Sequence, residues 1–241
     1  MRYLLYCIFR GPLPAGLEIP AGVGGQRVFT VVHQALGAAL SELAEPDLPR
    51  DTAELLTYGM VVDSFYCHST VIPLRYGCRV ESPCEAVGLL RKNHAAYAAL
   101  LRELEGLAEM GIQVLRDDPR AEAETDRLAV PPEHFPPRSG MSGAAYLEAK
   151  KLHYLGAQRA TVLQNTLVEK LCDSLHGSFV RHKMELPSSS RSHLTSLYFL
   201  VPRDSVESFR RAARQFPPQQ SVKLLFSGPW PPYNFVDSLQ P

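Results

Sequence analysis

Short, mainly apolar blocks open this chain. Residues 2–9 (RYLLYCIF) and 26–34 (QRVFTVVHQ) are rich in β-branched and aromatic side chains. A loop rich in Gly and Pro separates them, so both are predicted to be strands. Residues 35–43 (ALGAALSEL) fit either a third strand or a short helix.

The period then changes to that of a helix. Asp51 and Glu54 stand three residues apart, the spacing of a capping box, and predict a helix that ends near Ser69. The apolar positions on one side of its 3.6-residue repeat are Leu55, Val62, Phe65 and Tyr66. Residues 71–80 (VIPLRYGCRV) return to an extended pattern, with Pro73 restricting them to an edge strand or a bulge.

A second helix start is the clearest in the chain. Ser82 is predicted to be the N-cap, Pro83 the first helical residue and Glu85 the capping partner. Apolar residues continue at helical spacing until Gly106 ends the helix. Residues 109–115 (EMGIQVL) form the next predicted strand. The first half therefore reads as an α+β arrangement.

The second half begins after a charged and proline-rich stretch, residues 116–138, which is predicted to be a linker. Residues 142–177 predict one long helix with a leucine at every fourth position: Leu163, Leu167, Leu171 and Leu175. The elements expected after it are strands at 178–186 and 193–201, a helix capped by Asp204 and Glu207, and a strand at 221–226. This order resembles half of a ferredoxin-like fold.

The pattern as a whole predicts an α+β protein of two domains. Residues 1–115 would form the first domain, residues 116–138 the linker, and residues 139–241 a C-terminal α+β domain with a long helix.

Charge and composition exclude several classes of protein. The 241 residues contain 25 Lys plus Arg and 25 Asp plus Glu, so no net charge attracts nucleic acid or an anionic membrane. No apolar stretch approaches the roughly 18 residues that span a bilayer, and no leader peptide is evident. We therefore expect a cytoplasmic protein.

Candidate chemistry is sparse. Five cysteines without a C-x-x-C pair predict buried free thiols, and the spacing of Cys67, His68, Cys78 and Cys84 matches no zinc pattern. Glu105 and Glu109 are interpreted as a solvated or salt-bridged helix face. We predict no catalytic residues, no cofactor and no metal.

The unusual feature is residues 227–236 (SGPWPPYNFV). Gly228 permits a sharp turn, and three prolines fix the backbone and remove three N–H donors, which excludes a helix or a central strand. Such a backbone presents Trp230, Tyr233 and Phe235 at low entropic cost. The segment suits either a latch onto the chain's own core or an anchor for a partner.

At these residues the chain resembles the gas vesicle protein F/L family. SGPWPPYNFV is similar to the closing signature of that family, and YLLYCI to its opening strand. The segments IPLRYGCRV, LEGLAEMGIQVL and GAAYLEAKK resemble family segments in the same order. Tyr76 stands where phenylalanine is common in the family, and Cys78 where threonine is common.

The resemblance implies a modified ferredoxin-like N-terminal domain and a cytoplasmic accessory or minor shell protein of gas vesicles. It also implies binding to the small hydrophobic main shell protein, which would prevent aggregation of that protein during nucleation and assembly. Other gas vesicle accessory proteins are further candidate partners. For protein binding we select Trp230, Tyr233 and Phe235, with Arg75 and Tyr76 as second choices. Two alternatives stay open: a sensor or enzyme for a small ligand on a ferredoxin-like scaffold, and a purely structural latch.

Overall fold

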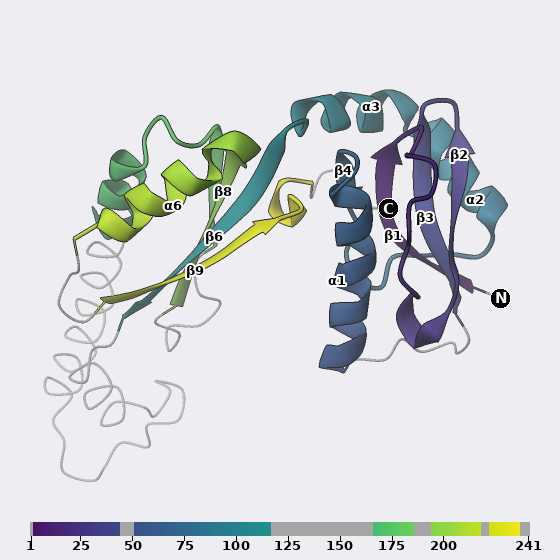
Figure 1. Cartoon of the computed structure of the whole chain (residues 1–241), viewed down its shortest axis with the longest axis horizontal. Coiled ribbons are helices and arrows are strands. Elements are labelled where there is room, and N and C mark those ends of the chain that lie inside the picture. The colour runs from purple at the N-terminus through teal and green to yellow at the C-terminus, as the bar shows by residue number, and fades with distance from the viewer. Residues whose placement is uncertain (1, 44–50, 117–165, 186–193, 218–221, 237–241) are drawn as a thin grey trace, which may run out of the picture. The chain divides into compact units, whose positions relative to one another are not determined.

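The computed structural model describes residues 2–43, 51–116, 166–185, 194–217 and 222–236 (Figure 1). The chain is α+β and divides into two compact units, each assembled from separate stretches. The first unit contains Met1–Met110, Phe199–Val206 and Ser227–Pro241, and the second contains Gly111–Tyr198 and Glu207–Phe226.

An antiparallel sheet forms the centre of the first unit. Its strands follow the order β2-β3-β1-β4, and a short strand β5 also pairs with β1. The strands are β1 (Arg2–Arg10), β2 (Val28–His33), β3 (Leu36–Leu43), β4 (Val71–Pro73) and β5 (Arg79–Val80). Six consecutive residues of β1, 4–9, are buried, as expected of a strand covered on both faces. The ambiguous stretch 35–43 is therefore a strand.

Three helices belong to this unit: α1 (Thr52–Tyr66), α2 (Pro83–Lys92) and α3 (His94–Glu103). Both predicted N-caps are confirmed. The Asp51 carboxylate accepts the Glu54 N–H at 2.8 Å, and the Ser82 hydroxyl accepts the Glu85 N–H at 3.2 Å. The continuous helix expected from residue 83 to Gly106 is wrong, because the chain leaves helical geometry at Asn93 (φ −106°, ψ 16°). The Asn93 side chain donates to the Leu89 carbonyl at 3.2 Å, a local bond that competes with regular helix formation.

The buried face of α1 differs from the prediction at its first turn. Val62, Phe65 and Tyr66 are buried, as expected, but Leu55 is 46% exposed. Tyr58 contributes instead, because the buried face of α1 begins one turn later than the apolar repeat suggested.

A second sheet has the order β7-β8-β6-β9. The strands are β6 (Leu107–Arg116), β7 (Arg181–Glu185), β8 (Leu194–Pro202) and β9 (Val222–Trp230). Residues 166–174 are helical, and α6 spans Val206–Gln215 after a 3₁₀ turn at Arg203–Ser205. Asp204 thus lies in that turn rather than at the start of α6. The predicted last strand continues beyond residue 226 to Trp230.

The leucine stripe of the predicted long helix is confirmed where the structure describes it, since Leu167, Leu171 and Leu175 are buried. The rest of that helix, residues 142–165, lies outside the described residues, as do 117–138 of the linker and the turn at 187–192. The domain boundaries and the ferredoxin-like comparison therefore stay predictions, whereas the α+β class is confirmed.

Candidate functional site

The C-terminal segment, residues 227–236, combines the end of β9 with a 3₁₀ turn at Tyr233–Phe235. Gly228 has φ +101°, and a Cβ there would lie 2.6 Å from the Glu109 carbonyl oxygen and 3.2 Å from the Met110 sulfur. Only glycine fits such a close approach of two backbones without strain. The turn predicted at Gly228 is thus also a contact with β6.

Two prolines shape the turn that follows. Pro231 and Pro232 are buried, and their carbonyls accept the N–H groups of Tyr233 at 2.8 Å and of Phe235 at 3.1 Å. Their fixed φ angles reduce the conformational freedom of the unfolded chain, which lowers the entropic cost of forming this turn. β9 is at the end of its sheet order, the position where a strand tolerates Pro229.

A carboxylate holds the turn in place. Glu109 on β6 accepts the backbone N–H of Asn234 at 2.8 Å through Oε2, and its Oε1 accepts the side-chain amide of Asn234 at 2.6 Å. Glu109 is only 4% exposed. Both oxygens of one buried carboxyl group accept hydrogen bonds from the same residue, so this pair fixes the position of the segment.

The sequence interpretation of Glu109 as part of a solvated or salt-bridged helix face is therefore wrong. Glu109 lies in strand β6, not in a helix, and it is buried. The available signal was a single carboxylate within an otherwise apolar strand, which needs a polar partner when buried. Asn234, its partner, was not among the predicted site residues.

The three aromatic side chains of the segment have different environments. Phe235 is 4% exposed, whereas Trp230 is 46% exposed. Tyr233 lies between these extremes, and burial raises the pKa of its phenol above the usual range. The structure therefore does not bring the three rings to one accessible surface. Trp230 is the ring that a partner can reach.

Arg75 and Tyr76 occupy the turn between β4 and β5. Arg75 is exposed, and its carbonyl accepts the Cys78 N–H at 3.1 Å. The Tyr76 ring packs edge-on against Tyr58, with the ring centroids 5.2 Å apart. Burial raises the pKa of Tyr76, and the nearby carboxylates of Glu54 and Asp51 add to this shift. Tyr76 is thus partly a packing residue beside the start of α1.

Tyr58 links this turn to the centre of the sheet. Its hydroxyl donates to the carbonyl of Leu74 at 2.8 Å, with the carbonyls of Leu5 and Tyr6 each at 3.1 Å. Its ring stacks on Tyr6, and the Tyr6 hydroxyl bonds with Ser41 at 2.8 Å. Burial raises the pKa of Tyr58 well above its usual range, so the phenol is neutral. These contacts belong to the core of the first unit.

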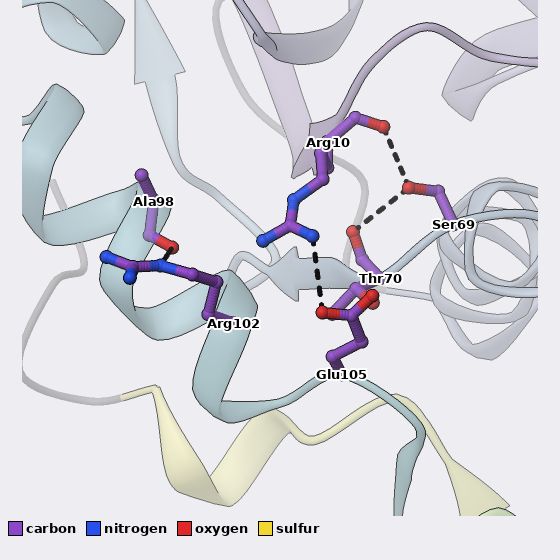
Figure 2. A network of polar contacts seen from close by, with 6 residues as sticks. All are labelled: Arg10, Ser69, Thr70, Ala98, Arg102 and Glu105. Carbon is purple, nitrogen blue, oxygen red and sulfur yellow. Dashed lines mark hydrogen bonds and ion pairs between the residues drawn. The ribbon is translucent and has the colours of Figure 1, made fainter.

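The other carboxylate that the sequence singled out, Glu105, lies at the surface. It forms an ion pair with Arg10 at 3.2 Å, and the Arg10 carbonyl accepts the Ser69 hydroxyl at 2.9 Å (Figure 2). The prediction of a salt-bridged carboxylate is confirmed here. Since both charged side chains are substantially exposed, the pair contributes on the order of 0–1 kcal/mol to stability.

The cysteines are free, as expected, but not uniformly buried. Cys7 is buried, whereas Cys67 and Cys84 are exposed, which corrects the prediction for these two. Each lies at the end of a helix, and neither side chain enters its apolar face. Within the described ranges, no three His, Cys, Asp or Glu side chains meet as a metal site.

Among the described helices, none has the length and apolar content that crossing a bilayer requires. This finding concerns helices of the described residues.

Comparison with known proteins gives the family. Residues 2–237 match the model of the family described as gas vesicle synthesis protein GvpL/GvpF. The chain belongs to the GvpL/GvpF family. Its role is therefore related to gas vesicles, as the sequence resemblance implied.

Relatives of this GvpL/GvpF chain match over most of their length. Gas vesicle protein F1 of Halobacterium salinarum is 22% identical, and the match covers 92% of this chain and 86% of the relative. Gas vesicle protein F of a Streptomyces species is 25% identical, and the match covers 98% of this chain and 100% of the relative.

Solved structures of the same family share the fold. The crystal structure of the gas vesicle protein GvpF from an Anabaena species superposes with a TM-score of 0.75 at 18% identity, covering 98% of this chain and 95% of that one. The crystal structure of GvpF from Microcystis aeruginosa superposes with a TM-score of 0.71 at 17% identity, covering 98% of each chain.

Proposed function

We propose that this chain is a gas vesicle accessory or minor structural protein that binds the small hydrophobic main shell protein. Binding would prevent aggregation of that protein during vesicle nucleation and assembly. Other gas vesicle accessory proteins are further candidate partners. In this proposal the protein acts in the cytoplasm and associates with the gas vesicle.

The observation that carries the proposal is the exposure of large apolar side chains on regular elements of a GvpL/GvpF chain. Leu56 and Met60 on α1 and Trp230 on β9 are 65%, 61% and 46% exposed. Exposed apolar groups that are held in place favour an interaction surface, since burying them against an apolar partner releases water at little entropic cost.

Within the C-terminal segment, the proposal assigns different roles to the predicted residues. Trp230 would contact the partner, while Phe235 and the Glu109–Asn234 pair would hold Trp230 in position. Tyr233, Arg75 and Tyr76 stay predicted binding residues of second rank. The alternative of a sensor or enzyme for a small ligand gains no specific support from the described residues.

The test is co-expression of the main shell protein with this chain, followed by sedimentation and co-purification. An unrelated globular protein of similar size, expressed at the same level, is the control. We expect the shell protein to stay in the supernatant and to co-elute with this chain only. Equal pelleting with both proteins, without co-elution, would refute the proposal.

A further inference from the structure

Helix α1 exposes an apolar surface on the side that does not face its own core. Leu56 and Met60 are one helical turn apart and are 65% and 61% exposed. Leu55 is 46% exposed as well, but it lies on the side of Val62 and Tyr66, one turn before the covered stretch begins. The opposite side of α1 lies along the sheet of the first unit (Figure 1). Its buried residues include Tyr58, Val61 and Phe65. The helix is therefore apolar on both sides, although only one side is covered within the first unit.

Gly59 is half-buried and lies at the border of this exposed face, next to Leu56. A Cβ atom at Gly59 would meet no heavy atom within 4 Å, so the fold of this chain does not need a glycine there. A glycine within a helix costs about 1 kcal/mol relative to alanine. Its use becomes reasonable if another backbone approaches α1 closely at this position, since small residues allow such an approach.

A groove runs beside the same helix. Its lining residues are Pro20, Ala21, Gly22, Gly25, Glu54, Thr57 and Met60. Met60 borders both this groove and the outward face of α1. The groove and the outward face therefore adjoin at Met60 within the first unit.

The charges along α1 have one sign. Residues 51–66 contain Asp51, Glu54 and Asp63 but no Lys or Arg. Glu54 is fixed at the groove because its Oε2 accepts the Gly24 N–H at 3.0 Å. An apolar partner with basic groups at its edge complements this surface, whereas an acidic partner would be repelled.

We propose that the outward face of α1, defined by Leu56, Gly59 and Met60 with the adjoining groove, binds an amphipathic helix of a partner protein. The bound helix presents an apolar stripe to Leu56 and Met60 and carries Lys or Arg beside Glu54 and Asp63. The inference rests on the proposed function for the identity of the partner, which is the shell protein. The apolar and acidic character of the surface, in contrast, follows from the structure of α1 alone.

The surface is tested with two fluorescent peptides of about 20 residues, long enough to form a helix on binding. Both carry leucines at helical spacing; one has lysines at the edges of the stripe and the other has glutamates. Binding to the full chain is measured by fluorescence anisotropy. We expect the lysine peptide to bind at least about tenfold more tightly, and its affinity to fall as salt is raised.

Two glycine variants locate the binding site. Gly59→Leu places a bulky side chain on the proposed surface, and Gly88→Leu is its match on α2, where a Cβ also meets no heavy atom within 4 Å. Leucine favours helix more than glycine, so both variants should melt no lower than the parent. We expect Gly59→Leu to weaken binding of the lysine peptide at least about tenfold, and Gly88→Leu to change it less than about twofold.

The inference is overturned if neither peptide binds, if both peptides bind equally, or if Gly59→Leu binds like the parent. It is also overturned if the chain dimerises in sedimentation analysis and Gly59→Leu makes it monomeric, because the occupant would then be a second copy. Co-expression with the shell protein separates this inference from the proposed function. If Gly59→Leu binds no peptide but still keeps the shell protein in solution, the function stands and α1 is not its surface.

Discussion

The C-terminal segment and helix α1 both place apolar side chains in the first unit, but in opposite ways. The segment looks like an exposed tail in sequence, yet Phe235 is buried and Asn234 is bound by the buried Glu109. Helix α1 looks like a core helix, yet Leu56 and Met60 are exposed. A rigid, aromatic segment is thus used mainly to fasten the chain, and an ordinary helix presents the accessible apolar surface.

The C-terminal segment is buried and the outer side of α1 is exposed because their polar groups find hydrogen-bond partners in different ways. Residues 227–236 bring the N–H of Asn234 to an available acceptor, Glu109, so this part of the segment can be buried without loss of hydrogen bonds. Helix α1 satisfies its own backbone, so it can remain at the surface with apolar side chains on its outer face. Burial of a segment in this unit therefore depends on hydrogen-bond partners for its backbone as well as on the hydrophobicity of its side chains.

The largest effect should come from removing the buried ring of the segment. Phe235→Ala is expected to lower the free energy of unfolding by about 3–5 kcal/mol, because it removes a large side chain from a packed site. Chemical denaturation measures this change. A loss below about 1 kcal/mol would mean that the segment does not fasten the unit, and the contrast with α1 would fail.

The next largest effect should come from the carboxylate. Glu109→Ala is expected to cost about 2–3 kcal/mol, since the backbone and side-chain donors of Asn234 both lose their acceptor. Asn234→Ala should cost less, because its backbone N–H keeps the bond to Oε2. The double variant should be less destabilised than the sum of the two single ones, as expected for residues in direct contact. Strict additivity would show that the pair does not act together.

Local patterns in the sequence were sufficient for much of the fold. The caps at Asp51 and Ser82, the strand at β1 and the buried leucines of residues 167–175 are each set by a few neighbouring residues, and the structure has them as expected. Such features depend on side chain to backbone bonds and on the period of apolar residues, both of which are visible in one stretch of sequence.

The candidate site could be predicted only in part, for physical reasons. The rigid backbone of residues 227–236 follows from its prolines, but the carboxylate that binds Asn234 comes from a strand more than a hundred residues away. Glu109 has no local feature that identifies Asn234 as its partner. The exposed apolar side of α1 could not be predicted either, because an apolar repeat does not show which sides of a helix are covered.

Alanine substitutions at Gly228 in the C-terminal segment and at Gly59 in α1 should change stability in opposite directions. Gly228→Ala should lower the free energy of unfolding by about 1–3 kcal/mol, because φ is +101° and the new Cβ would lie against the Glu109 carbonyl. Gly59→Ala should raise it by about 0.5–1 kcal/mol, since the position is helical and open. Thermal and denaturant unfolding of both variants measure these changes. Equal signs would contradict the distinction between a fastened and an accessible region.

Among the aromatic side chains of the segment, Trp230 is expected to contribute less to stability than Phe235, although tryptophan is the larger residue. With 46% of its surface exposed, Trp230 loses less on truncation than a buried ring, and Trp230→Ala should lower the free energy of unfolding by about 1–2 kcal/mol. Trp230→Phe keeps an aromatic group and serves as the matched control. Retention of the shell protein in the supernatant should fall with Trp230→Ala and persist with Trp230→Phe. If Trp230→Ala instead destabilises the chain as much as Phe235→Ala, Trp230 belongs to the fastening contacts, and α1 is left to provide the proposed binding surface.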